Sequence, residues 1–130
     1  MITLAMDRGA VERWVDGYER LWRTPGTDGL ADLFQPEAAY LPSPWATPVA
    51  GLEAIAEFWD AERDSADEEF GLYSEVVAVD GETAVVRVSV DYGAANGGRW
   101  RDLWIISLGP DGRCYSFEEW PFAPGQPDGH

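Results

Sequence analysis

Apolar side chains recur at intervals of three and four residues from Val11 to Trp22, which is the spacing of one helix face. This pattern predicts an amphipathic helix of about four turns, and Thr24–Gly26 is expected to end it. Thr27 is expected to cap a short second helix, which Pro36 ends. The same spacing predicts a third helix from about Leu52, whose apolar face is made by Leu52, Ile55, Phe58 and Trp59.

The segments beside the third helix are expected to be mostly irregular. Ala38–Leu41 predicts only a brief strand, and Pro42–Gly51 contains three prolines, which argue against regular structure. Trp45 lies among these prolines and is a candidate cover for the mouth of a cavity. Six acidic residues between Asp60 and Glu69 are expected to form a solvated surface.

In the second half of the chain, the pattern changes to the alternation of strands. It predicts four strands, at residues 72–79, 82–92, 99–108 and 113–122. Asp80-Gly81 favours a hairpin turn between the first two strands, and Gly109–Gly112 turns the third strand back into the fourth. Helices followed by an antiparallel meander predict an α+β domain with the helices packed on one face of a curved sheet.

The strand at 99–108 carries a carboxylate on an aromatic face. Because strand side chains alternate between two faces, Asp102 shares a face with Trp100 and Trp104. Ionised acids are rarely buried without a partner, since their desolvation costs several kcal/mol. Either Asp102 has a structural partner, or this face of the sheet lines a pocket.

A second acid is expected to lie beside Asp102. If the Gly109–Gly112 turn has two or four residues, Glu119 lies directly opposite Asp102; a three-residue turn with a bulge would point Glu118 inward instead. We favour Glu119, because this choice also points Phe117 inward. Two acids this close would not both ionise readily and would share a proton, so the pair could act as acid and base at once. The alternative is that both acids only accept structural hydrogen bonds.

Seven tryptophans are a large aromatic load for 130 residues. Indole rings serve either as core or as the wall of a cavity for flat organic ligands. Tyr18 rises from the first helix and is a candidate third polar contact beside the two acids. The candidate ligand-binding residues are Trp14, Trp22, Trp45, Trp59, Trp100, Trp104 and Phe117.

Composition excludes several other kinds of chemistry. The formal net charge of −15 disfavours nucleic acid as a partner, and the absence of lysine excludes Schiff-base catalysis. Cys114 is the single cysteine and His130 the single histidine, so we expect no metal site, no cofactor and no histidine-based triad. No stretch has the pattern of a secretory signal or a membrane span, and we expect a cytoplasmic protein.

The order of these elements resembles the nuclear-transport-factor-2-like cone, and the local sequence resembles its SnoaL-like branch, which includes polyketide cyclases and ketosteroid isomerase relatives. Four segments carry the resemblance: Tyr18–Tyr40, Gly51–Trp59, Arg99–Arg113 and Phe117–Phe122. It implies a single SnoaL-like domain over residues 1–130, with a core at about 8–122 and a loose tail at 123–130. It also implies a cone-shaped, curved antiparallel sheet with three helices packed on its concave side.

The resemblance places Tyr18 and Asp102 where ketosteroid isomerase-like members hold a developing enolate oxygen. The general base of those enzymes is missing, because prolines and Ser43 stand where it would be. We therefore expect a cofactor-independent isomerase, cyclase or hydrolase acting on a small apolar carbonyl or epoxide compound. Asp102, Glu119 and Tyr18 are its candidate catalytic residues. The alternative is a non-catalytic ligand-binding or accessory protein of the same fold.

The outer face of the predicted sheet is also apolar. Leu103 and Ile105 form, with valines of the neighbouring strand, a surface that helices on the other face cannot cover. Exposed apolar faces of this kind usually mark association sites. The resemblance implies a homodimer through this outer sheet face. We expect no membrane partner.

Overall fold

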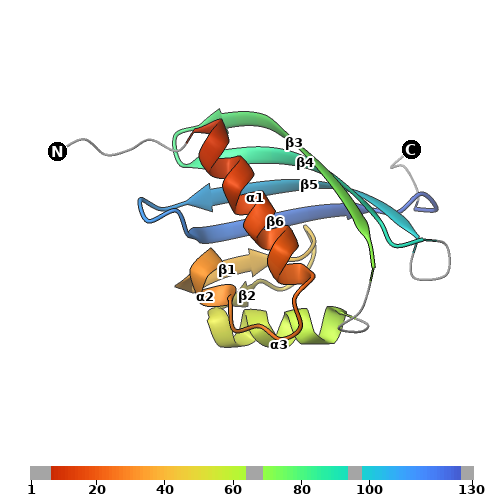
Figure 1. Cartoon of the computed structure of the whole chain (residues 1–130), viewed down its shortest axis with the longest axis horizontal. Coiled ribbons are helices and arrows are strands. Elements are labelled where there is room, and N and C mark those ends of the chain that lie inside the picture. Colours follow the sequence, from red (N-terminus) through yellow and green to blue (C-terminus); the bar gives the residue numbers. More distant parts are fainter. Residues whose placement is uncertain (1–6, 64–68, 94–97, 127–130) are drawn as a thin grey trace.

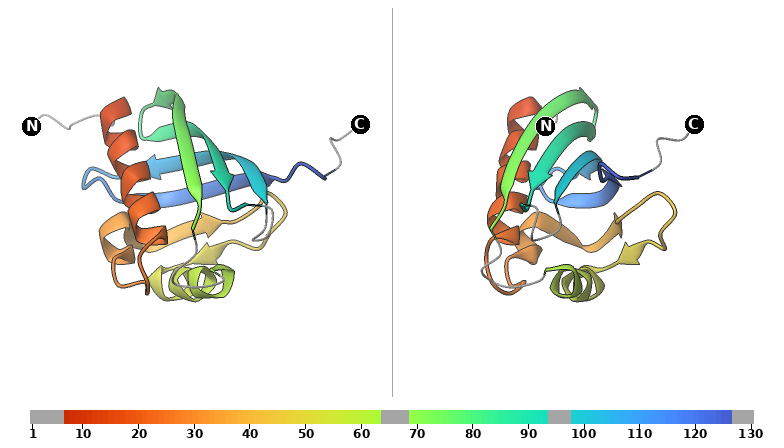
Figure 2. Two further views of the ribbon diagram at one scale, coloured as in Figure 1. Left: turned by 45° about the vertical axis from the view of Figure 1, so that its right-hand side comes forward. Right: turned by 90° about the vertical axis from the view of Figure 1, so that its right-hand side faces the viewer.

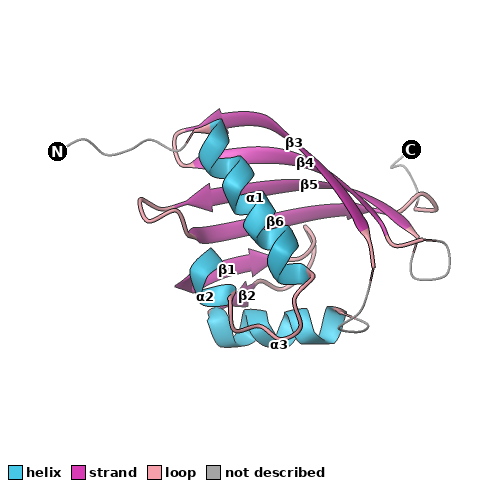
Figure 3. Ribbon diagram, in the orientation of Figure 1, coloured by secondary structure: helices cyan, strands magenta, loops and turns pink. Residues whose placement is uncertain are grey.

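The structure is a computed structural model, and it describes residues 7–63, 69–93 and 98–126. Within these ranges, the alternating segments form six strands and the segments with helical spacing form three helices. The helices are α1 (Arg8–Trp22), α2 (Leu30–Leu33) and α3 (Leu52–Glu62). The strands are β1 (Phe34–Leu41), β2 (Val49–Ala50), β3 (Gly71–Asp80), β4 (Thr83–Asp91), β5 (Arg99–Leu108) and β6 (Cys114–Phe122). The α+β class is confirmed, and Figure 3 shows the helices gathered around one curved sheet.

The sheet has the strand order β2-β1-β6-β5-β4-β3. Its strand pairs are antiparallel except one, the parallel pair of β1 and β6. The prediction of a wholly antiparallel sheet was therefore wrong at this pair. Parallel neighbours need a long connection between them, and here it comprises all the elements from β2 to β5.

Two local predictions near β1 were also wrong. The strand begins at Phe34 rather than Ala38, directly after α2, and Val49–Ala50 pairs with it inside the segment expected to be irregular. Thr27 does not cap α2 through its side chain; its carbonyl oxygen accepts from the Leu30 N–H at 3.1 Å, and Gly29 is the cap residue. Local turn bonds and pairing with a distant strand override the sequence pattern at these positions.

The sheet curves around α1, which crosses its concave side (Figures 1 and 2). The register of the β3–β4 pair shifts near Val77, and that of the β5–β6 pair shifts near Tyr115. Irregularities of this kind bend a strand and increase its twist. In Figure 2 the strands bend over α1 on one side, and α3 lies at the far end beside β1 and β2.

Helix α1 supplies the helical half of the core. Asp7 caps it by accepting from the Ala10 N–H at 2.8 Å, and Arg8 fastens its first turn to β3 by donating to the Val76 carbonyl oxygen at 2.7 Å. Its buried face packs on the inner side of the sheet and consists of Val11, Trp14, Val15 and Tyr18. No helix in the described ranges is both long enough and apolar enough to cross a membrane.

Alternation along β5 can be tested by two matched truncations. Ile106 is fully buried on the inner face, so Ile106→Ala should lower the free energy of unfolding by about 2–5 kcal/mol. Ile105→Ala removes the same atoms from the partly exposed neighbouring position and should cost clearly less. Urea unfolding followed by tryptophan fluorescence measures both losses. Equal losses would show that the two residues do not face opposite sides of the sheet.

Candidate functional site

A cavity of about 410 Å³ opens between the inner face of the sheet, α1, β1 and α3. Strands β4, β5 and β6 contribute its floor, because every second side chain on each strand points into it. Its wall consists of Tyr18, Trp22, Tyr40, Pro42, Phe58, Glu62, Phe70, Leu72, Val90, Tyr92, Trp100, Asp102, Trp104, Glu119 and Pro121. The wall is thus mainly aromatic and contains three carboxyl groups.

Asp102 lies on this wall, as the alternation of β5 predicts. The residue is only 7% exposed, and one side-chain oxygen, Oδ1, has no hydrogen-bond partner among the described residues. Burial raises the pKa of Asp102, and hydrogen bonds with Glu119, Trp104 and the backbone of Phe122 only partly oppose this effect. Asp102 therefore ionises less readily than an ordinary aspartate, and one of its two oxygens is buried without a partner among the described residues.

Glu119 also lines the cavity, whereas Glu118 belongs to the outer face, so the favoured alternative agrees with the structure. The expected pairing was nevertheless wrong by two residues. The turn is one residue longer than expected, since Leu108 lies opposite Cys114, and the irregularity near Tyr115 adds a second residue. Glu119 therefore lies opposite Trp104, and Asp102 lies opposite Pro121. The two acids are therefore diagonal neighbours on the adjacent strands β5 and β6. Long side chains can reach one another across this spacing.

The environment of Glu119 favours its protonated form. Its pKa lies well above the usual value, first because of burial and then because of hydrogen bonding with Asp102 and the charge of that residue. The indole Nε1 of Trp104 donates to Glu119 Oε2 at 3.2 Å and acts in the opposite direction. Hence Asp102 and Glu119 form one coupled pair that holds a proton more strongly than either acid would in water.

Two tyrosines extend the polar part of the wall. The hydroxyl of Tyr18 lies 3.2 Å from that of Tyr40, so one donates to the other and a hydroxyl hydrogen remains for a further acceptor. Burial is the main cause that raises the pKa of both tyrosines, so they serve as neutral donors. Sequence reasoning missed Tyr40, because the short strand assigned to it had no predicted partner.

The candidate ligand-binding residues divide into two groups. Trp22, Trp100 and Trp104 line the cavity. Trp14, Trp59 and Phe117 are buried in the core and do not belong to the cavity wall. The indole N–H of Trp14 is already bonded to the Leu33 carbonyl oxygen at 2.9 Å, which gives this residue an architectural role.

Trp45 does not cover the cavity mouth in this structure. Its side chain is 99% exposed and does not belong to the cavity wall. Pro42, from the same loop, lines the cavity in its place. The loop around Trp45 is irregular, as the prolines predict, but the indole ring does not point towards the cavity.

Among the described acids of the predicted solvated run, Glu62 is the one that reaches the cavity wall. It ends α3 and lies four residues after Phe58, which places both side chains on one helix face. That spacing was a signal in the sequence, but the run of acids around Glu62 concealed it. Residues 64–68 of the run lie outside the described residues.

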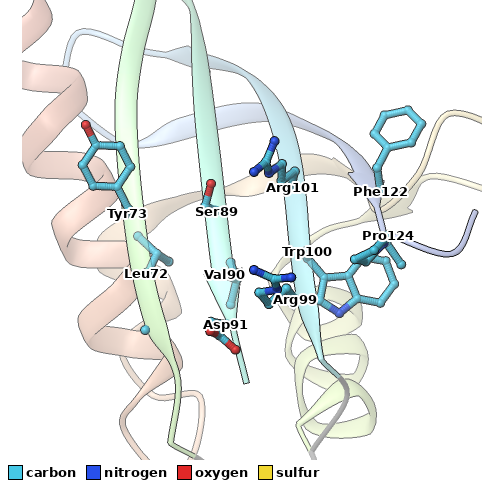
Figure 4. Close-up of a pocket in the computed structure, with 12 residues that line it drawn as sticks. Leu72, Tyr73, Ser89, Val90, Asp91, Arg99, Trp100, Arg101, Phe122 and Pro124 are labelled. Carbon is cyan, nitrogen blue, oxygen red and sulfur yellow. The ribbon is translucent and has the colours of Figure 1, made fainter. Parts of the chain in front are cut away.

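A second hollow, of about 690 Å³, lies on the outer side of β3, β4 and β5 (Figure 4). We call it the outer groove. Figure 4 shows Tyr73 and Ser89 along its strands, with Arg99 and Arg101 on β5 and Phe122 at its far side. Neither arginine forms an ion pair with a described residue. Leu72, Val90 and Trp100 line both hollows, so the groove begins at the rim of the cavity.

Metal and thiol chemistry have little support from the described side chains. These residues contain no group of three histidine, cysteine, aspartate or glutamate side chains arranged to hold a metal ion. Cys114 is fully buried, and burial raises the pKa of its thiol to about 12, so it is not a reactive nucleophile.

The helix α1 on the concave side of a curved, unclosed sheet is the arrangement of the nuclear-transport-factor-2-like fold. Within that class, the SnoaL-like domain matches residues 11–117, and the chain belongs to the SnoaL-like family. No curated protein matches the chain.

Solved structures show the same fold. The epoxide hydrolase/cyclase-like enzyme SalBIII of pyran ring formation in salinomycin is 16% identical, with a TM-score of 0.69 over 89% of this chain and 93% of that one. A candidate ketosteroid isomerase from Kribbella flavida is 17% identical, with a TM-score of 0.68 over 95% and 82% of the two chains. A candidate SnoaL-like polyketide cyclase from Jannaschia sp. CCS1 is 19% identical, with a TM-score of 0.63 over 89% and 90%. At these identities the likeness shows the fold alone.

The protonation of Glu119 predicts how stability depends on pH. Because folding raises the pKa of this acid, its contribution to stability is present below its unfolded pKa of about 4.3 and is lost as the pH rises through the folded value. As the pH rises from about 4.5 towards neutrality and beyond, the free energy of unfolding should fall more for the wild type than for Glu119→Gln. Urea unfolding at a series of pH values measures this difference.

Glu118→Gln is the matched control, since it makes the same chemical change one residue away on the outer face. It should keep the pH dependence of the wild type. If Glu119→Gln kept it as well, Glu119 would not hold a proton in the folded protein.

Proposed function

We propose that this protein is a small-molecule enzyme in which Asp102 and Glu119 perform acid/base chemistry on a small apolar carbonyl or epoxide compound. The observation that carries the proposal is the coupled carboxyl pair on the wall of an aromatic cavity. Perturbed acids in a cavity are typical of sites that move protons near neutral pH. The reaction is an isomerisation, a cyclisation or a hydrolysis, and it uses only residues of this chain.

The two acids are suited to different steps. Glu119 has the more strongly raised pKa and holds the shared proton, so it donates to the carbonyl or epoxide oxygen of the substrate. Asp102 has the less strongly raised pKa of the two acids and removes a proton from carbon or from an attacking hydroxyl group. The proton lost at one end of the substrate is thus balanced by the proton gained at the other. Tyr18, supported by Tyr40, adds a donor to the developing oxyanion.

The structural neighbours agree with this chemistry in outline. The name of SalBIII refers to an epoxide hydrolase/cyclase-like reaction, and that of the Kribbella flavida protein refers to ketosteroid isomerisation. Both names refer to reactions in which an oxygen of an apolar compound gains charge. Their low identity leaves the substrate of this chain to be decided by its own cavity wall.

The alternative is a non-catalytic ligand-binding protein, and two observations favour it. The indole N–H of Trp104 donates to Glu119, so this acid already accepts a structural hydrogen bond, which is the alternative role that the sequence left open for it. In addition, Pro42 lines the cavity just after β1, where the resemblance would require a basic carboxylate. Turnover experiments separate the two functions.

Substitution of the pair should abolish turnover while leaving the fold intact. A panel of flat ketones and epoxides is first screened by thermal shift, where a ligand at 100 times its Kd adds about 2.7 kcal/mol of stability. For any compound that is turned over, Glu119→Gln and Asp102→Asn should lower kcat by about 10²- to 10⁴-fold, as expected for loss of a general acid or base. Glu118→Gln should keep wild-type kcat. If compounds bind and Asp102→Asn weakens them, but none is turned over, the ligand-binding alternative is correct.

We further propose that two copies of the chain associate through the outer face of the sheet. Five large apolar side chains are exposed on this face: Tyr73, Val77, Leu103, Trp120 and Phe122. The face also carries both signs of charge, since Arg101 and Glu118 lie on neighbouring strands β5 and β6, so it can complement itself across a two-fold axis. Apolar patches of this kind on a sheet face are typical of association sites.

Light scattering during size-exclusion chromatography tests this association. The wild type should elute at twice the chain mass of 14.4 kDa, and Leu103→Glu should shift it to the monomer mass because a charge is placed within the apolar face. Ala61→Glu adds the same charge at an exposed position of α3 and should remain dimeric. A monomeric wild type at micromolar concentration would rule out the proposed dimer.

A further inference from the structure

Trp104 is bonded to the acid pair although it is also part of the core. It lies directly opposite Glu119 in the register of β5 and β6, and both residues line the cavity from the inner face of the sheet. Its indole Nε1 donates to Glu119 Oε2 at 3.2 Å. Asp102, two residues earlier on β5, also forms a hydrogen bond with the Trp104 side chain. One indole ring thus links the acid of β6 to the strand that carries its partner.

The aromatic core fixes the direction of this N–H group. Trp104 is 2% exposed, and its ring centroid lies 4.5 Å from that of Tyr18 and 5.3 Å from that of Phe117. Trp14 meets the ring edge-on, at 6.4 Å between centroids and an interplanar angle of 86°. Because these rings leave the indole little room to turn, its N–H stays directed at Glu119 whether that acid is neutral or ionised.

The fixed donor decides which oxygen of Glu119 carries the proton. An indole N–H can only donate, so Oε2 must keep a lone pair for it. In the neutral acid, Oε2 is therefore the carbonyl oxygen and Oε1 carries the proton. When Oε1 passes this proton to a substrate oxygen, negative charge spreads over both carboxylate oxygens. The bond from Trp104 is then charge-assisted and roughly twice as strong, so it favours the proton transfer.

Glu119 has no cation beside it on the described part of the cavity wall, which contains no arginine, lysine or histidine. The titratable groups that share the cavity with it come from all the elements around it: Asp102 of β5, Tyr18 of α1, Tyr40 of β1, Glu62 of α3 and Tyr92, which follows β4. Burial, Asp102 and Glu62 raise the pKa of Glu119, whereas the indole N–H of Trp104 lowers it. Trp104 therefore opposes the influences that would keep this acid permanently neutral.

We propose that Trp104 is a positioning residue of the acid pair, because its indole N–H fixes the proton of Glu119 on Oε1 and stabilises the carboxylate that remains after the proton is transferred. The catalytic consequence rests on the proposed function, whereas the hydrogen bond itself can be tested without a substrate. The bond that would also suit a purely structural acid then serves the proton transfer.

Two-dimensional NMR spectra of the tryptophan side chains over a series of pH values test the hydrogen bond. In the wild type, the indole N–H signal of Trp104 should move with the same midpoint as the carboxyl carbon signal of Glu119, because the donor senses the charge of its acceptor. Glu119→Gln should remove most of this movement, and Glu118→Gln should keep it. The Trp14 signal is an internal control, since its N–H donates to the Leu33 carbonyl oxygen, which does not titrate. If the Trp104 signal is insensitive to pH, or moves equally in Glu119→Gln, the inference is wrong.

Trp104→Phe removes the donor and keeps an aromatic ring. The carboxyl carbon signal of Glu119 should then titrate about one pH unit higher than in the wild type, because a hydrogen bond to the charged form is lost. Trp14→Phe makes the same change in a buried indole that donates to a backbone carbonyl, so it should leave the midpoint unchanged. An unchanged or lower midpoint in Trp104→Phe would overturn the inference. If this variant does not fold, the spectra of the wild type and Glu119→Gln decide.

Turnover separates this inference from the proposed function. For a compound that is turned over, the pH at which kcat/KM falls for lack of the acid should rise by the same shift in Trp104→Phe. If no compound is turned over while both titrations behave as described, the proposed function fails and the role of Trp104 in holding the proton of Glu119 stands. If turnover depends on Glu119 but Trp104→Phe keeps the pH profile of the wild type, the inference fails and the proposed function stands.

Discussion

The removal of two carboxyl groups from water is the constraint on which the rest of this structure depends. Asp102 and Glu119 lie on the inner face of the sheet, where charge is costly. The fold reduces this cost by bringing the acids close enough to share a proton and by directing the indole N–H of Trp104 at one of them. Helix α1 closes the space above them with aromatic rings, so the same burial that holds the proton also shapes the cavity.

Periodicity along the chain was enough to predict the parts that depend on local sequence. It gave the helix faces, the alternation of β5 that turns Asp102 inward, and the choice of Glu119 over Glu118. It could not give the partners of β1, because the pairing of Phe34–Leu41 with β6 joins segments about 80 residues apart, and no local pattern records such a contact. Tyr40 was missed for this reason.

The diagonal placement of the two acids has a different cause. The turn leaves Leu108 opposite Cys114 rather than Arg113, and an irregularity near Tyr115 adds one more residue to β6. Together these two shifts move Glu119 from the position opposite Asp102 to the one opposite Trp104. Turn residues such as Gly112, with its positive φ of 79°, are visible in a sequence, whereas a bulge within a strand seldom is. Because these two one-residue shifts add up to two, Phe117 and Glu119 stay on the inner face, so Glu119 lines the cavity although the predicted pairing was wrong.

The parallel pairing of β1 with β6 also affects how the chain folds during its synthesis. Tyr40 and Phe117 are register partners across this pair, so one wall of the cavity joins an early segment of the chain to a late one. Contacts between distant segments form slowly, because a long loop must close before they can stabilise anything. A nascent chain that has emerged only as far as β5 leaves the edge of β1 without its neighbour and exposes aromatic side chains meant for the interior. Strand β6, which is made after the other strands of this sheet, is therefore the one that covers this edge, and until it emerges the exposed edge of β1 favours aggregation.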